Sequence, residues 1–312
     1  MRRTLAKLDP LERYSAASER AAGRIIAAYS TSFGLATRLL GPRHRTHVRN
    51  IYALVRVADE LVDGVAAEAM VDAEVQRTML DELEADVEQA LRTGYSSNPI
   101  VHAFGRTARA AGIDASLTGP FFASMRTDLR VAGSPGRDVT TEGGAPAPKE
   151  FDAGAHAEYV YGSAEVVGLM CLRVFLRDEQ ISSAQSARLE YGARRLGAAF
   201  QNVNFLRDLA DDTDRLGRSY LTAGEEMTPE RQAEWITTIR AQLGDAEAVL
   251  PELPRDARVA VGCAYRLFAK LTDRLAETPA EQLRTRRVRV ADPVKAVLVL
   301  RSALDARKSA NA

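Results

Sequence analysis

The chain has 312 residues, of which 46% are hydrophobic and 27% are charged, a composition typical of a soluble globular protein with a substantial core. Lysine plus arginine and aspartate plus glutamate both total 42, so the net charge gives no general attraction to nucleic acid or to acidic lipid. We therefore expect no nucleic-acid partner, and any anionic ligand must be held by a local cluster of residues.

Apolar residues recur at three- and four-residue spacing, and alanine, leucine, arginine and glutamate dominate, which favours helices over strands. The pattern predicts an all-α protein. The predicted helices, in chain order, are 11–40, 45–64, 67–93, 98–111, 117–131, 155–177, 183–212, 229–247, 255–276 and 292–307. The predicted breaks are Gly41-Pro42, Gly94, Gly112, Gly119-Pro120 and Leu250-Pro251.

Segment 132–154 departs from the helical pattern because glycines and prolines interrupt it. We expect a mobile surface loop there. A tolerated insertion is the simpler interpretation, and a lid over an active site is the alternative. No Gly-x-Gly-x-x-Gly motif and no Gly-Lys-Ser/Thr phosphate loop occurs, so a nucleotide-binding domain is not expected.

The two cysteines, Cys171 and Cys263, are too few for a disulfide framework and lack the spacing of a metal site. The N-terminus carries charges but no apolar stretch like that of a secretory signal. The longest apolar runs, such as 166–172, are far shorter than the roughly 20 residues that a membrane span needs. We therefore expect a cytoplasmic protein without a transmembrane segment.

A first acidic motif occupies segment 56–63, with the sequence RVADELVD. Asp59 and Asp63 are one helical turn apart and project from the same face, with Arg56 beside them. The apolar Val62 falls within the same sector, so this face is not a purely polar stripe directed at water. Two carboxylates among apolar neighbours need a partner.

A second acidic motif lies near position 208. Asn204, Asp208 and Asp212 are spaced at i, i+4 and i+8, so on a helix their oxygens would form a ladder along one face. Gln201 and Arg207 project close to this ladder. The face would therefore combine acids, amides and a cation.

Either motif alone could be a solvated face of salt bridges. Two such motifs in apolar sequence favour a divalent cation instead, because clustered unpaired carboxylates would have raised pKa values and reduce stability. Ligands that are all oxygen indicate Mg²⁺, with Mn²⁺ as an alternative, and Mg²⁺ commonly bridges carboxylates to substrate phosphates. The motifs thus predict metal-assisted ionisation of an allylic diphosphate.

Four stretches match the motifs of one known family. They are YSTSF at 29–33, YALVRVADELVD at 52–63, YVYGSAEVVG at 159–168, and the segment 201–221, which ends in GRSYL. Together they resemble the squalene and phytoene synthase family, bacterial phytoene synthases most of all. The resemblance implies a single domain over 1–312 with the isoprenoid-synthase fold, a helical bundle around a central apolar cavity.

The resemblance also implies roles for single residues. Tyr159 is a candidate catalytic residue, because it or the released pyrophosphate would accept the final proton. The residues that would bind the diphosphates or border their pockets are Ser30, Ser32, Phe33, Arg56, Gln201, Arg207, Tyr220, Tyr265 and Arg287. The residues that would bind metal and drive the ionisation are Asp59, Asp63, Asn204, Asp208 and Asp212.

Several features leave alternatives open. The small residues of 159–168 also fit close helix packing, and the arginines of 284–289 also fit a solvated charge run. Tyr29 and Thr31 stand where the family often has lysine or histidine, so one diphosphate donor is missing or supplied elsewhere. The loop after residue 129 and the stretch 212–220 are longer than usual for the family.

The reaction implied is head-to-head condensation of two geranylgeranyl diphosphates to phytoene through a cyclopropyl diphosphate, a step of carotenoid biosynthesis that needs no nicotinamide. Substrates with long apolar tails also lead us to expect peripheral contact with a membrane. One alternative is a farnesyl diphosphate-using presqualene diphosphate, squalene or dehydrosqualene synthase. Others are a terpene cyclase, which the second motif fits less well, and a non-catalytic prenyl-lipid-binding protein.

Overall fold

All regular elements in the part of the chain that the structure describes are helical, which confirms the predicted all-α class. The computed structural model describes residues 8–30, 32–62, 65–132, 153–209, 227–283, 285, 287–291, 294–295, 297–298 and 302. The helices up to residue 132 are α2 (Pro10–Tyr29), α3 (Ser32–Thr37), α4 (Pro42–Val62), α5 (Val65–Glu68), α6 (Ala73–Thr93), α7 (Pro99–Ala111) and α8 (Ala115–Ala132). The later helices are α9 (Ala153–Val160), the π-helix η1 (Tyr161–Glu165), α10 (Val166–Leu176), α11 (Ser183–Arg207), α13 (Pro229–Val249), the 3₁₀ helix η2 (Leu250–Glu252), α14 (Arg255–Glu277) and α15 (Ala280–Leu283).

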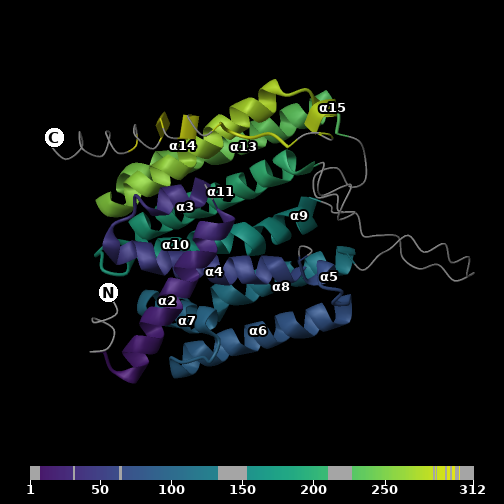
Figure 1. Ribbon diagram of the computed structural model, residues 1–312. Helices are drawn as coiled ribbons and strands as arrows, with labels where there is room; N and C mark the ends of the chain where they lie inside the picture. Colours follow the sequence, from purple (N-terminus) through teal and green to yellow (C-terminus); the bar gives the residue numbers. More distant parts are fainter. Residues whose placement is uncertain are drawn as a thin grey trace, which may run out of the picture.

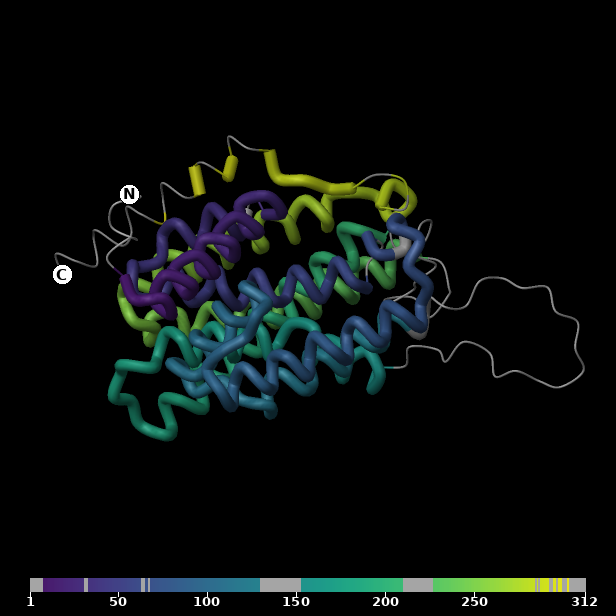
Figure 2. The backbone as a smooth tube through the Cα atoms, turned by 60° about the horizontal axis from the view of Figure 1, so that its bottom comes forward, coloured from purple at the N-terminus to yellow at the C-terminus, as the bar shows by residue number. Residues whose placement is uncertain are grey.

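The long helices stack in layers (Figure 1). Helices α6, α7 and α8 lie at the bottom of the view, α4, α9, α10 and α11 in the middle, and α13 and α14 at the top. Helix α2 crosses this stack and packs on α4 and α7. The turned view in Figure 2 shows the purple N-terminal helices beside the yellow-green C-terminal part of the chain. This agrees with the packing of α3 on α14. Helices distant in sequence therefore enclose a common interior.

Local sequence signals start α6 and end α6 and α7. The Asp72 side chain caps α6 by accepting hydrogen bonds from the backbone N–H groups of Glu74 at 3.0 Å and Val75 at 2.9 Å. Gly94 ends α6 with φ 79° and Gly112 ends α7 with φ 65°, left-handed conformations that glycine adopts without strain. The predicted breaks at these two glycines are confirmed.

The predicted helix 11–40 is wrong, because it is two helices. Ser30 is extended, with φ −132° and ψ 115°, and ends α2. Its hydroxyl oxygen accepts a hydrogen bond from the Phe33 N–H at 3.0 Å, which satisfies a free donor at the start of α3. The serine therefore competes with the helix for backbone hydrogen bonds, as serine commonly does.

Three further boundaries differ from the prediction. The predicted helix 67–93 starts too early, because α5 ends at Glu68 and α6 begins at Ala73, after the Asp72 cap. The expected break at Pro120 is absent, since α8 runs through it; burial of Phe121, Phe122 and Met125 offsets the cost of a proline within a helix. Helix α11 ends earlier than predicted, with Asp208 as its C-cap at φ −100°, ψ 12°. Residues 133–152 of the predicted loop, and most of the predicted helix 292–307, lie outside the described residues.

A continuous helix, α9–η1–α10, runs through the middle of the bundle. A Cβ on its Gly162 would lie 2.2 Å from the Pro120 carbonyl oxygen, and one on Gly168 would lie 2.6 Å from the Ala193 carbonyl oxygen. Within Ala153–Leu176 it is long and apolar enough to cross a membrane, but 50% of its most apolar window is buried in the protein. Its packing on α4, α7, α8 and α11 is that of a core helix.

Candidate active site

A cavity of about 490 Å³ lies within the bundle. Helices α3, α4, α8, α10, α11 and α14 all contribute to its wall, which is mostly apolar. Several of its polar residues come from the late parts of α4 and α11, which lie at the same side of the molecule in Figure 1. Those that the sequence predicted as site residues are Arg56, Asp59, Tyr159, Gln201, Asn204, Arg207, Asp208 and Arg287.

Asp208 is the centre of an ionic cluster at the polar end. The Nε of the adjacent Arg207 donates to Asp208 Oδ1 at 2.8 Å, and its Nη2 contacts Oδ2. From the C-terminal segment, Arg287 Nε lies 2.7 Å from Oδ1 and Nη2 lies 3.3 Å from Oδ2. Two guanidinium groups thus hold one carboxylate, in a forked geometry that suits diphosphate oxygens equally well.

Arg56 supplies a third guanidinium to the cavity. Its Nη2 forms an ion pair with Glu60, one turn later on α4, and its guanidinium carbon lies 4.5 Å from the centre of the Tyr29 ring. Its Nε is buried and has no hydrogen-bond partner in the described part of the chain. A buried N–H without an acceptor costs free energy, and an anionic ligand would remove that cost.

The oxygen donors at this end suit a hard divalent cation. Asp59, Asn204 and Asp208 line the cavity, and none of these ligands is a cysteine or histidine. Asp63 and Asp212 lie outside the described residues, and within those residues no three acids, histidines or cysteines cluster as a metal site. The donors present fit Mg²⁺ as a partial set of ligands that substrate phosphates and water would complete.

The N-terminal motif borders the cavity through aromatic rings. Phe33 and Tyr52 both line it, with their ring centres 6.1 Å apart in a stacked arrangement. Phe33 also meets the edge of Phe200 at 6.3 Å. Ser30 does not line the cavity but hydrogen-bonds to Tyr52, whose pKa is raised by burial. The side chain of Ser32 lies outside the described residues.

A buried tyrosine and carboxylate form a second polar pair in the cavity wall. The Tyr159 hydroxyl donates to Asp128 Oδ2 at 2.9 Å, and the two residues are 6% and 2% exposed. The sequence analysis missed Asp128. A usable signal was present, because Asp128 follows Phe121 and Met125 at helical spacing on the buried face of α8.

Besides Ser30, one predicted binding residue of the described structure does not line the cavity. Tyr265 lies outside its lining and hydrogen-bonds to Glu247. Burial, and then that hydrogen bond, raise the pKa of Tyr265 to about 12. Tyr220 lies outside the described residues. The diphosphate-binding roles of both tyrosines stay predictions.

The sequence is similar to that of one known protein family. Residues 26–228 match the family model described as squalene/phytoene synthase. Phytoene synthase 3 of Zea mays is 28% identical over 270 residues, which cover 81% of this chain and 58% of the maize protein. Phytoene synthase 1 of Arabidopsis thaliana is 30% identical over 203 residues, covering 65% of this chain and 42% of that protein. The 15-cis-phytoene synthase of a Paracoccus strain is 28% identical over 276 residues, covering 82% of each.

Solved structures share the fold. A dehydrosqualene synthase in complex with a ligand superposes with a TM-score of 0.69 at 19% identity, covering 96% of this chain and 100% of the other. A squalene synthase from Alicyclobacillus acidocaldarius gives a TM-score of 0.63 at 14% identity, covering 88% of this chain and 99% of the other. At these identities the similarity shows the helical fold alone.

Proposed function

The chain belongs to the squalene/phytoene synthase family, whose members are prenyltransferases, and from this we propose that it joins two geranylgeranyl diphosphates head to head to form phytoene. The observation that carries the proposal is one cavity with a long apolar wall and with Asp59, Asp208 and three arginines gathered at its polar end. A diphosphate would bind at that end while its prenyl tail lay along the apolar wall. The named phytoene synthases among its relatives support the choice of substrate.

The arginines would hold and orient the diphosphates. Arg207 and Arg287 already share the carboxylate of Asp208, and the buried Nε of Arg56 has no acceptor among the described residues. Guanidinium groups placed where negative charge develops would stabilise the departing pyrophosphate. Mg²⁺ bound by Asp59, Asn204 and Asp208, with Asp63 and Asp212 as further predicted ligands, would neutralise charge on the leaving group.

The carbon chemistry needs two ionisations. In the first, a C–O bond of one substrate breaks to release pyrophosphate, the double bond of the second substrate attacks, and loss of a proton closes a cyclopropane ring. In the second, the remaining diphosphate leaves, the skeleton rearranges, and loss of another proton gives the triene at the centre of the product. No reductant is consumed, so no nicotinamide is required. The apolar wall would keep water from the cations.

Tyr159 is the residue best suited to receive a proton within the cavity. Its hydroxyl donates to Asp128 Oδ2, and a phenol oxygen can accept a proton as well as donate one. As a proton arrived, the phenol proton would move toward the Asp128 carboxylate. Released pyrophosphate is the alternative acceptor.

The test is product analysis. Purified protein would be incubated with Mg²⁺ and either geranylgeranyl or farnesyl diphosphate, with and without NADPH, and the hydrocarbon identified by mass. We expect phytoene and pyrophosphate from geranylgeranyl diphosphate without NADPH. A C30 product with geranylgeranyl diphosphate unreacted would indicate a farnesyl-using synthase, and an NADPH requirement would indicate a squalene-type second step. Absence of pyrophosphate release would indicate a non-catalytic lipid-binding protein.

We further propose a cytoplasmic location with peripheral contact to membranes, since the tails of the substrates and the hydrocarbon product partition into lipid. Fractionation without detergent should release most of the protein from membranes. Protein that is released only when detergent dissolves the bilayer would contradict this proposal.

A further inference from the structure

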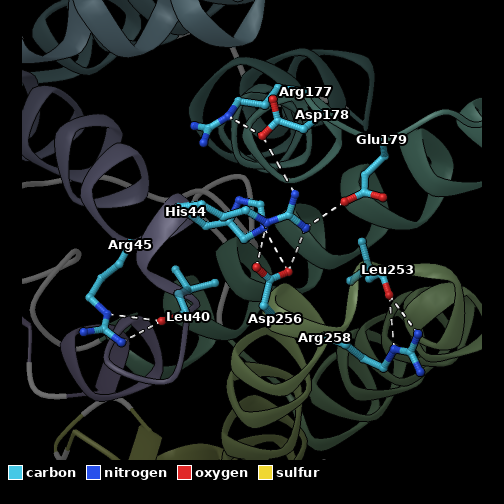
Figure 3. Close-up of polar contacts among 10 residues, drawn as sticks. Leu40, His44, Arg45, Arg177, Asp178, Glu179, Leu253, Asp256 and Arg258 are labelled. Carbon is cyan, nitrogen blue, oxygen red and sulfur yellow. Dashed lines mark hydrogen bonds and ion pairs between the residues drawn. The ribbon is translucent and has the colours of Figure 1, made fainter.

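A charged cluster lies around the first residues of α4 (Figure 3). Arg43 Nε donates to Asp256 Oδ2 at 2.7 Å and Arg43 Nη2 to Asp256 Oδ1 at 3.0 Å. The same Nη2 reaches Glu179 Oε1 at 2.7 Å. His44 Nε2 lies 3.2 Å from Asp256 Oδ1. We call Arg43, His44, Glu179 and Asp256 the staple.

The staple joins three parts of the chain that are far apart in sequence. Arg43 and His44 open α4, Glu179 follows α10, and Asp256 is in the first turn of α14. The backbone adds to this connection, because the Gly41 N–H donates to the Asp256 carbonyl oxygen at 2.9 Å. A Cβ on Gly41 would lie 2.7 Å from Asp256 Oδ2, so only glycine permits this approach.

Each of the three joined segments carries an apolar residue of the cavity wall. These residues are Leu40, Phe175 and Leu253, which we call the floor. They come from the end of the cavity opposite to Asp59, since Leu40 precedes α4 and Asp59 lies near its end. The staple and the floor are therefore neighbours in all three segments.

One side-chain contact joins the staple to the floor, and two arginines next to the staple bind backbone oxygens of the floor. The His44 ring meets Phe175 edge to face, with ring centres 5.3 Å apart. The Leu40 carbonyl oxygen accepts from Arg45 Nη2 at 2.7 Å, and the Leu253 carbonyl oxygen accepts from Arg258 Nη2 at 2.9 Å (Figure 3). The Phe175 side chain and the backbone of Leu40 and Leu253 are thus held in place.

This arrangement is a costly way to close a cavity. The His44 side chain is 0% exposed, and its Nδ1 is buried without a hydrogen-bond partner in the described structure. Buried polar groups that are only partly satisfied cost free energy, whereas an apolar plug of the same volume would not. Charged groups with directional bonds do, however, fix relative positions more narrowly than apolar contacts do.

We propose that the staple fixes the depth of the cavity and thereby selects the length of the prenyl chain. The inference rests on the proposed prenyl-coupling function and assigns Arg43, His44 and Asp256 as positioning residues that do not touch substrate. A prenyl tail one isoprene unit too long must push Leu40, Phe175 or Leu253 outward. The staple opposes this movement because the three segments would have to separate.

The experiment measures chain-length selectivity in Asp256→Asn and Arg43→Gln. The readout is the ratio of kcat/KM for a diphosphate five carbons longer than the preferred substrate to kcat/KM for the preferred one. We expect each variant to raise this ratio about tenfold, the lower end of what one methylene is worth in a close-fitting apolar pocket. Asp81→Asn is the matched control, since Asp81 accepts from Arg126 at 2.8 Å on α6, which contributes no residue to the cavity wall.

A change in the ratio separates a positioning role from a purely structural one, because loss of folded protein lowers both kcat/KM values equally. Phe175→Ala, which deepens the floor directly, should also raise the ratio. Folded Asp256→Asn and Arg43→Gln with an unchanged ratio would overturn the inference, and so would an unchanged ratio in Phe175→Ala. Wild-type protein that couples no prenyl diphosphate of any length would instead overturn the proposed function.

Discussion

Arg287 and Asp208 are 79 positions apart in the sequence, yet Arg287 Nε lies 2.7 Å from Asp208 Oδ1. The contact joins the C-terminal segment to the end of α11 at the polar end of the cavity. Arg207 holds the same carboxylate, so Asp208 has two cationic partners. A metal ion and a diphosphate at this place would share these groups, with the carboxylate turning to the metal and the guanidinium groups to phosphate.

Arg287→Gln should weaken diphosphate binding. The variant loses a charged donor to the phosphates, and a hydrogen bond to a charged group is worth about 1.5–3 kcal/mol, so KM should rise about tenfold or more. Steady-state kinetics at saturating Mg²⁺ measure this. Arg289→Gln is the control, since Arg289 is exposed in the same segment and does not line the cavity. Equal KM values in both variants would contradict the role of Arg287.

Asparagine at Asp59 or Asp208 should lower turnover by orders of magnitude, because each change removes a proposed charged metal ligand while preserving volume. Asp63→Asn and Asp212→Asn are expected to behave alike. Helix content by circular dichroism should stay that of the wild type, and Asp273→Asn, which alters an exposed pair with Arg240, should keep its activity. Near-normal activity of all four site variants across a magnesium titration would exclude the metal-binding role.

Much of the candidate site could be predicted from the sequence because it depends on local spacing. Arg56 and Asp59 lie on one helix, and so do Gln201, Asn204 and Arg207; all five line the cavity, as their spacing of three residues suggested. Helix periodicity likewise predicted the all-α class, which requires no knowledge of how the helices pack.

The remaining features depend on contacts between distant segments. Nothing near Asp128 in sequence indicates that Tyr159 would bond to it, because the pairing arises from the packing of α8 on α9. The path of α8 through Pro120 likewise follows from burial of its neighbours rather than from its own propensity. The separation of α2 from α3 at Ser30 depends on a hydroxyl group that competes with the helical backbone.

Tyr159→Phe should slow the second step, in which the final proton is lost. The change removes the proposed acceptor oxygen and the hydrogen bond that Tyr159 donates to Asp128. General acid–base residues typically contribute about 10²–10⁴-fold to rate, so kcat should fall within that range and the cyclopropyl diphosphate should accumulate. Product analysis by mass detects both effects. Tyr191→Phe is the control, since the exposed Tyr191 hydroxyl donates to Asp245 at 3.0 Å. Unchanged kcat would assign the proton to pyrophosphate.

His47 should make the protein less stable in mild acid. Its Nδ1 lies 2.9 Å from Thr107 Oγ1, and burial lowers its pKa from 6.5 to about 4. The charged or titratable groups that act on its pKa are Arg177, His44, Asp178 and Arg106, of which only Asp178 favours the protonated ring. As the pH falls below 6.5 the unfolded chain binds a proton that the folded protein does not, so stability is lost between pH 6.5 and about 4.

His47→Gln should therefore reduce the pH dependence of the free energy of unfolding in that window by up to one proton, since other buried histidines still contribute. Urea unfolding at several pH values between 7 and 4 measures the slope of the free energy of unfolding against pH. Arg92→Gln, at an exposed pair with Glu88, should leave the slope as in the wild type. An identical slope in His47→Gln would show that another group controls the acid lability.

Gly162→Ala should destabilise the fold at the centre of the bundle. The added Cβ would lie 2.1 Å from Ser124 Oγ and 2.2 Å from the Pro120 carbonyl oxygen, and the backbone of α8 cannot turn aside as a flexible side chain could. Overpacking of this kind costs about 1–3 kcal/mol. Gly244→Ala on α13 is the matched control, because no heavy atom lies within 4 Å of its Cβ and alanine is favoured over glycine within a helix by about 0.5–1 kcal/mol. The melting temperature and the free energy of unfolding should therefore fall in Gly162→Ala and rise in Gly244→Ala. Equal stability would mean that α8 and η1 separate readily, and the close approach at Gly162 would then not be what holds the Tyr159 end of the cavity wall in place.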